Sequence, residues 1–99
     1  MSRSLIVLPL AQQDLISSHD YLNQVRRGLG QQFDKRIREA FNRIEYVPEL
    51  YAKVWKDVRA VRIKQFRHVI YYVILDDRIE VLAVLHGARD ESTWKERVS

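Results

Sequence analysis

The stretch IEVLAVLHGARD, residues 79–90, runs from the most apolar segment of the chain into a dense polar cluster. A segment as apolar as residues 79–85 predicts a strand that is buried within a sheet. Residues at the exit of such a strand are held by a rigid scaffold, where binding and catalytic sites are often built. The plainer interpretation of residues 86–97 is a strand end, a turn and a solvated tail. The stretch therefore predicts the centre of a sheet and marks its exit as a candidate site.

The residues before this stretch predict two more strands. Residues 54–63 are rich in β-branched side chains, and residues 68–75 are nearly all apolar or aromatic. Asp76 and Asp77 supply a turn between residues 68–75 and 79–85. Tyr71 and Tyr72 are neighbours in an extended segment, so we expect one of them in the core and the other at the surface. Residues 54–85 thus predict a β-meander of three strands.

The N-terminal half predicts a short strand followed by two helices. Residues 4–8 form the strand candidate, and Pro9 suits the first turn of the helix that follows. Two apolar stripes then recur at helical steps, and a link with two glycines separates them. The first stripe comprises Ala11, Leu15, Ser18, Leu22 and Val25, and the second comprises Phe33, Ile37, Ala40, Ile44 and Val47, widened by Phe41. Pro48 ends the second helix, and so short a link predicts an antiparallel helical hairpin.

These elements together predict one α+β domain spanning residues 1–99. The first strand cannot stand alone and must join the same sheet as the meander. The order is therefore β-α-α-β-β-β, with the helical hairpin packed on one face of a small, mainly antiparallel sheet. The other face of the sheet is uncovered. Arg62 and Lys64 are two residues apart in an extended segment, so their side chains share one face, and on the uncovered face both could point to solvent or a partner.

Composition narrows the possible functions. Hydrophobic residues make up 46% of the 99 residues, which suffices for one core. The absence of cysteine excludes a disulfide framework, a thiolate metal site and a cysteine nucleophile. The apolar run at residues 5–11 is too short to span a membrane and contains Pro9, so it is also a poor signal-peptide core. We expect a soluble, cytoplasmic protein.

Positive charge is concentrated in one segment. The net charge is +4, and residues 53–67 hold six basic residues against one acid, Asp57. The basic residues are Lys53, Lys56, Arg59, Arg62, Lys64 and Arg67. Such a local field attracts phosphate or an acidic protein surface. A strand edge protected from aggregation by lysine and arginine would look similar, so this alternative stays open.

The sequence predicts neither a metal site nor a cofactor. His19, His68 and His86 lack close metal-ligand spacing, and the chain has no HExxH motif, no glycine-rich phosphate loop and no Ser-His-Asp order. His68 and His86 lie at the ends of predicted strands, and histidine is the side chain most often used for proton transfer, so either is a candidate general base. A histidine at a strand end is more often a hydrogen-bonded structural residue, and both interpretations stay open.

Residues spread along the chain match a known family pattern. They are Asp14, Leu15 and Tyr21 in the first predicted helix, Val58, Arg59, Phe66 and residues 69–72 in the sheet, residues 79–90 ending in HGARD, and then Trp94 and Arg97. Together with the predicted element order, this pattern resembles the RelE/ParE superfamily of bacterial toxins, and its ParE-like branch in particular. The resemblance runs from Leu5 to Arg97. One departure is that many relatives carry Pro-Tyr after the phenylalanine, where this chain has Arg67 and His68.

The resemblance implies the toxin of a type II toxin–antitoxin pair, neutralised in a hetero-oligomer by a small antitoxin whose flexible segment folds on it. ParE relatives block DNA gyrase and thereby replication, whereas RelE relatives cut messenger RNA on the ribosome. Because both activities share one fold, the fold alone does not choose between them. An acidic antitoxin segment would be attracted by the basic segment. We expect partner binding at Lys53, Lys56, Arg59, Arg62, Lys64, Arg67, Arg89, Trp94 and Arg97.

The RelE-like alternative makes specific chemical demands. Cutting RNA through its 2′-hydroxyl needs a proton acceptor, a proton donor and cations that stabilise the phosphorane-like transition state. The cations would be Arg59, Arg62, Lys64 and Arg89. RelE-type nucleases often carry a tyrosine or histidine close to the terminus, but here no tyrosine follows Arg89, and Trp94 does not exchange a proton. We therefore expect a gyrase inhibitor without catalytic residues.

A third interpretation is a nucleic-acid-binding module without toxin activity that uses the same basic segment. It lacks a helix-turn-helix, a zinc finger or the paired surface aromatics of an RNA-recognition sheet.

The polar cluster after residue 85 has an expected packing. We expect Arg89 and Asp90 to form a local ion-paired or hydrogen-bonded turn. The ring of Trp94 should fold back onto the domain, while Arg97 should remain free for solvent or a partner.

Overall fold

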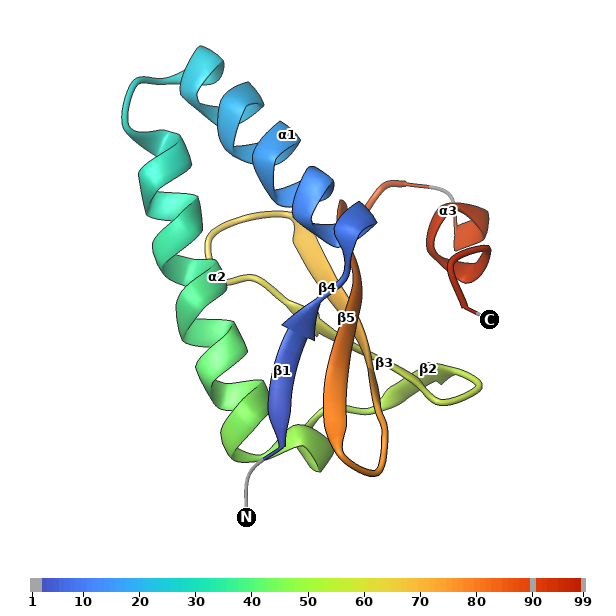
Figure 1. Ribbon diagram of the computed structural model, residues 1–99. Helices are drawn as coiled ribbons and strands as arrows, with labels where there is room; N and C mark the ends of the chain where they lie inside the picture. The colour runs from blue at the N-terminus through green and yellow to red at the C-terminus, as the bar shows by residue number, and fades with distance from the viewer. Residues whose placement is uncertain (1–2, 90, 99) are drawn as a thin grey trace.

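A five-stranded sheet lies at the centre of the computed structural model, which describes residues 3–89 and 91–98 (Figure 1). The strand order is β1-β5-β4-β3-β2, and the pair of long helices covers one face. In chain order the elements are β1 (Ser4–Val7), α1 (Pro9–Val25), α2 (Leu29–Tyr46), the 3₁₀ turn η1 (Pro48–Leu50), β2 (Lys53–Trp55), β3 (Val58–Arg62), β4 (His68–Ile74), β5 (Arg78–His86) and α3 (Glu91–Lys95). The α+β class and the helical hairpin on a mainly antiparallel sheet are confirmed.

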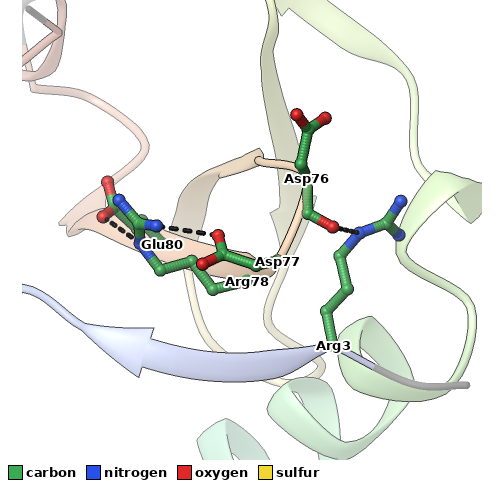
Figure 2. Close-up of polar contacts among 5 residues, drawn as sticks. All are labelled: Arg3, Asp76, Asp77, Arg78 and Glu80. Carbon is green, nitrogen blue, oxygen red and sulfur yellow. Dashed lines mark hydrogen bonds and ion pairs between the residues drawn. The ribbon is translucent and has the colours of Figure 1, made fainter.

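The first strand joins the sheet as predicted. β1 pairs with β5 in parallel, with Leu5 opposite Ile79, and all other pairs are antiparallel. Just before β1, Arg3 donates a hydrogen bond of 3.2 Å to the carbonyl of Asp76 in the β4–β5 turn (Figure 2). In the same turn Arg78 ion-pairs with Asp77 and with Glu80 (Figure 2). The Arg3 hydrogen bond links the residue before β1 to the β4–β5 turn, and strand pairing places β5 between β1 and β4.

The two long helices meet closely at the link between them. Gly28 adopts a φ of 87°, a left-handed conformation that favours glycine. A Cβ on Gly30 would lie 2.7 Å from the carbonyl oxygen of His19, so only glycine allows the backbones to approach there. The Gly30 amide donates a 2.8 Å hydrogen bond to the side chain of Asn23. The predicted antiparallel hairpin is therefore held by local backbone geometry as well as by its apolar stripes.

Both predicted stripes reach the core, but their last residues do not. The buried members are Ala11, Leu22, Phe33, Ile37, Ala40 and Ile44, packed with Val61, Ile63, Ile70, Tyr72, Ile79, Val81 and Val84 of the sheet. Val25 and Val47 are exposed because each stands at the end of its helix, beyond the sheet. Tyr72 is the buried member of the tyrosine pair, and its hydroxyl donates a 2.6 Å hydrogen bond to the carbonyl of Pro48. Burial raises the pKa of Tyr72 to about 12.

The expectation of one strand over residues 54–63 is wrong. The segment forms two strands, β2 and β3, joined by a tight turn at Lys56 and Asp57. Lys56 adopts a φ of 51°, and Trp55 then pairs with Val58 across the turn. The β-branched residues on both sides of the turn are continuous in sequence, and no glycine or asparagine marks the reversal. The meander therefore has four strands.

The strand β5 is apolar on both faces and contains a β-bulge. Tyr71 pairs with Ala83 and Tyr72 pairs with Val81, which leaves Leu82 as the extra residue. Leu82 and Ala83 consequently both pack on the face away from the helices, in a second cluster of buried residues. Trp94 of α3 joins that cluster and is only 4% exposed, which confirms that its ring folds back onto the domain. Figure 1 shows α3 separated by the sheet from α1 and α2.

No helix in the described part of the chain combines the length and apolar character needed to cross a membrane.

Candidate partner-binding groove

A groove of about 730 Å³ lies on the sheet face away from the long helices. Strands β3 and β4 form its floor, and the loop after β5 and α3 form a wall. We call it the arginine groove; its lining comprises Val54, Ala60, Arg62, Phe66, Arg67, Val69, Tyr71, His86, Gly87, Ala88, Arg89, Glu91 and Trp94. The polar stretch after residue 85 thus contributes His86, Gly87, Ala88, Arg89 and Glu91 to the lining of this groove.

Three arginines from separate segments line the groove. Arg62 comes from the end of β3, Arg67 from the β3–β4 turn and Arg89 from the loop after β5, and all three are exposed. Within residues 3–89 and 91–98, none of their guanidinium groups makes a hydrogen bond or ion pair. Glu91 is the acidic residue in the described lining. The groove therefore presents cationic groups that are available to an anionic partner.

Aromatic rings form the base of the groove but are largely used in packing. The rings of Tyr71 and Trp94 stack with centroids 4.5 Å apart and an interplanar angle of 15°. Phe66 packs edge-on against Phe33 of α2, with centroids 5.3 Å apart. Burial, and next the nearby carboxylate of Glu91, raise the pKa of the Tyr71 phenol above its ordinary value. Tyr71 is therefore protonated at neutral pH and is a poor general base.

The two sheet histidines pair across β4 and β5 but have different surroundings. His86 is exposed in the groove, and its Nδ1 accepts a 3.1 Å hydrogen bond from the Ala88 amide. His68 is 8% exposed, and its Nδ1 is buried with no hydrogen-bond partner among the described residues. Burial, and next the nearby His86, lower the pKa of His68 below its ordinary value. His86 is consequently the histidine that a ligand in the groove would meet.

An ion pair holds the wall of the groove in place, and the expectation that Arg97 is free is wrong. The Arg97 guanidinium binds the Asp14 carboxylate of α1 at 2.6 and 3.2 Å. Both side chains are nearly buried, at 15% and 12% exposed. Asp14 also accepts a 3.0 Å hydrogen bond from the Val84 amide, while Arg97 donates a 3.0 Å bond to the Leu82 carbonyl. β1 ends opposite Val81, so the backbone groups of β5 beyond Val81 have no partner in β1. The Asp14–Arg97 ion pair supplies hydrogen-bond partners for two of these groups, the Val84 amide and the Leu82 carbonyl.

Other residues expected to bind a partner have structural contacts. Arg59 donates hydrogen bonds to the carbonyls of Tyr51 at 2.7 Å and Glu49 at 3.3 Å, and so clamps the segment after α2. Lys53 ion-pairs with Asp57 at 3.2 Å, and the Lys56 ammonium lies 4.5 Å from the centroid of the Trp55 ring. Lys64 is exposed in the β3–β4 turn, outside the groove lining. The expected Arg89–Asp90 contact involves a residue outside the described part of the chain.

The arginine groove thus unites four of the predicted partner-binding residues: Arg62, Arg67, Arg89 and Trp94. Sequence reasoning did not assign Val54, Ala60 and Val69 to the site, since their position depends on which face of the sheet each strand residue occupies. Asp14 also escaped assignment as a support of the site, although it was among the residues that matched the family pattern. Among the described residues, no group of three or more metal-binding side chains lies close together.

Several solved structures share this fold. The chromosomal ParDE TA system from P. aeruginosa matches with a TM-score of 0.76 at 16% identity, over 86% of this chain and 96% of that chain. A double arginine-to-alanine mutant of the E. coli toxin RelE in the free state matches with a TM-score of 0.74 at 14% identity, over 100% of both chains. At these identities the likeness concerns the fold, which is the α+β fold of RelE and ParE toxins.

Sequence comparison then narrows this class. Toxin ParE2 from two strains of Mycobacterium tuberculosis, CDC 1551 / Oshkosh and ATCC 25618 / H37Rv, is 30% identical over 57 residues, which are 58% of this chain and 54% of that protein. This chain thus spans about half the length of the curated relatives it matches. The family model for the ParE toxin of the type II toxin–antitoxin system, parDE, matches residues 5–91. The chain belongs to the ParE toxin family of type II toxin–antitoxin systems.

Proposed function

We propose that this toxin inhibits DNA gyrase, blocks replication and is neutralised in a complex with its cognate antitoxin. Membership of the ParE family supports the toxin–antitoxin role. The observation that favours gyrase over messenger RNA is the packing of Trp94, which is 4% exposed and stacked on Tyr71. The C-terminal aromatic residue therefore closes the sheet face and supplies no acid–base group. Both candidate targets are cytoplasmic, so we expect the toxin to act there.

Only some of the cations and proton-transfer groups that RNA cleavage needs line the groove. Of the four cations considered for a nuclease, Arg59 is bound to backbone carbonyls and Lys64 lies outside the lining. Arg62 and Arg89 remain as cations that face the groove. Tyr71 lies beside them, but its raised pKa disfavours the phenolate that a general base requires. These contacts support a toxin that acts by binding to its target.

Induction of the chain in growing cells tests this proposal. We expect growth to stop, with DNA breaks and filamentous cells appearing while protein synthesis continues at first. Co-expression of the antitoxin should restore growth and yield a complex that co-purifies with the toxin. Normal growth during accumulation of folded toxin, without antitoxin, would count against a toxic role.

His86 favours a second candidate function, ribosome-dependent cleavage of messenger RNA. Its ring lies in the same lining as Arg62 and Arg89, and histidine is the commonest general acid–base residue. Mapping messenger RNA ends soon after induction separates the two functions. Under the gyrase proposal no new ends appear within translated codons. Prompt cleavage that His86→Gln abolishes would establish the nuclease and overturn the proposal.

A further inference from the structure

Two histidines that are far apart in the sequence lie opposite each other in the sheet. His68 begins β4 and His86 ends β5, and the two residues are direct partners in the antiparallel register. Their ring centroids are 5.7 Å apart. We propose that His68 and His86 together bind a divalent transition-metal ion of the zinc class, with water in its other coordination positions. This site goes beyond the proposed function and does not depend on the target of the toxin.

The distance between the two rings fits a shared metal ion. A zinc ion that is bound at about 2.0–2.1 Å by one nitrogen of each of two imidazoles, in tetrahedral geometry, holds the ring centroids roughly 5 Å apart. The separation of 5.7 Å between His68 and His86 is slightly longer. Because His86 is exposed, its ring can turn toward His68 without displacing a packed side chain. The pair therefore reaches metal-binding geometry by a small movement of one side chain.

Both rings have a nitrogen that can bind the ion. Nδ1 of His68 is buried and has no hydrogen-bond partner among the described residues. A buried polar atom is unfavourable unless a protein group, a water molecule or an ion satisfies it. Nδ1 of His86 accepts one exposed hydrogen bond of 3.1 Å from the Ala88 amide. An ion that binds this nitrogen displaces that bond, and water can replace it at the exposed amide.

The surroundings of the pair favour the neutral rings that metal binding requires. Burial, and next the nearby His86, lower the pKa of His68 below its ordinary value. Phe33 packs edge-on against the His68 ring, with centroids 4.7 Å apart, so this side of the pair is apolar. His68 therefore stays unprotonated to a lower pH than an exposed histidine and remains able to bind a metal ion.

The composition of the site predicts which ion binds and how tightly. Imidazole suits zinc, copper and nickel ions, whereas Mg²⁺ and Ca²⁺ prefer oxygen ligands. Among the described residues no third metal-binding side chain joins the pair. The charged residues that line the arginine groove with His86 have a net positive charge, which opposes cation binding: Arg62, Arg67, Arg89 and Glu91. We therefore expect an exchangeable ion, held less tightly than one with four protein ligands.

The third histidine of the chain has no such freedom. Nδ1 of His19 lies 2.8 Å from the Asp34 carboxylate, and its Nε2 lies 3.2 Å from the side-chain nitrogen of Asn23. Both ring nitrogens are thus engaged within the helical hairpin. His19 is consequently the matched control for the pair in the sheet.

Titration calorimetry of Zn²⁺ into the untagged, full-length toxin tests the proposal. We expect one ion to bind per chain, and Mg²⁺ not to bind. Loss of a residue that only orients a metal ligand already costs about 10–100-fold in affinity, so His86→Gln and His68→Gln should each weaken Zn²⁺ binding at least about tenfold. His19→Gln should leave the affinity unchanged. The affinity should also fall between pH 7.5 and 5.5, because protons compete with the ion for the rings.

Nuclear magnetic resonance identifies the ligands independently. Addition of Zn²⁺ should shift the ring resonances of His68 and His86 together and leave those of His19 in place. Circular dichroism shows whether each variant is folded, and His86→Gln decides if His68→Gln is not, because the His86 side chain is exposed. Unchanged Zn²⁺ affinity in His86→Gln would overturn the proposal. Loss of binding in His19→Gln, or no binding at millimolar Zn²⁺, would overturn it as well.

Discussion

The two faces of the sheet are built on different principles. Under α1 and α2, apolar side chains recur with helical spacing and are completely buried, as at Phe33 and Ile44. On the other face, the five-residue helix α3 contributes one buried ring, Trp94, and leaves the arginine groove beside it. The first face holds the fold together, while the second leaves the exposed side chains of Arg62, Arg67 and Arg89 at the surface. The periodicity of the sequence predicts the residues buried under α1 and α2, but it does not predict which residues line the arginine groove.

The largest expected effect is on the face under the helices. Phe33→Ala removes a fully buried ring that contacts Phe66 and His68. The free energy of unfolding should therefore be about 3–5 kcal/mol lower than in the parent protein. Val54→Ala on the groove side is the matched control, and at 52% exposure it should change the free energy by less than about 0.5 kcal/mol. Urea denaturation followed by circular dichroism measures both. Similar losses in the two variants would contradict the division between the faces.

The ion pair behind the groove gives the next effect. Asp14→Ala leaves the nearly buried Arg97 without its carboxylate and the Val84 amide without its acceptor, so we expect a loss of about 3 kcal/mol. Asp14→Asn keeps an oxygen for Val84 and should lose less. Acrylamide quenching of Trp94 fluorescence in a Trp55→Phe background shows whether α3 separates from the sheet. Unchanged quenching and stability in Asp14→Ala would show that this pair does not hold the wall.

These two regions explain what the sequence allowed us to predict. Periodicity of 3.6 and 2 identified both helices and the strands β4 and β5, because each forms one continuous buried surface. The β2–β3 turn was missed because Lys56 adopts a left-handed conformation without a glycine signal. The Asp14–Arg97 pair joins residues 83 positions apart, and the bulge at Leu82 decides which side chains face the groove. Such contacts depend on tertiary packing and leave no local pattern.

Two arginines of β3 offer a smaller, matched comparison between the faces. Arg59 donates hydrogen bonds to the carbonyls of Tyr51 and Glu49, whereas Arg62 is exposed in the groove. Arg59→Gln should therefore destabilise the fold by about 1 kcal/mol, since it removes hydrogen bonds made by a charged donor. Arg62→Gln should stay within about 0.5 kcal/mol of the parent. Thermal denaturation of the two variants would contradict this view if Arg62→Gln proved the more damaging.

The smallest expected effect is a dependence of stability on pH that His68 causes. Burial, and next the nearby His86, lower the pKa of His68 from its ordinary value of 6.5 in the folded protein. As the pH falls below 6.5, the unfolded chain takes up a proton that the folded chain does not, so stability decreases until the lowered pKa is reached. His68→Phe should remove this part of the decrease, whereas His86→Gln should remove only the smaller share that His86 contributes. Urea midpoints between pH 7.5 and 5 that remain parallel in His68→Phe and the parent would contradict the assignment.

A supercoiling assay with purified DNA gyrase and the folded toxin tests the proposed target itself. We expect the toxin to inhibit supercoiling increasingly as its concentration rises, and prior addition of the antitoxin to restore gyrase activity. Full supercoiling in the presence of excess toxin, shown by circular dichroism to be folded, would contradict this target.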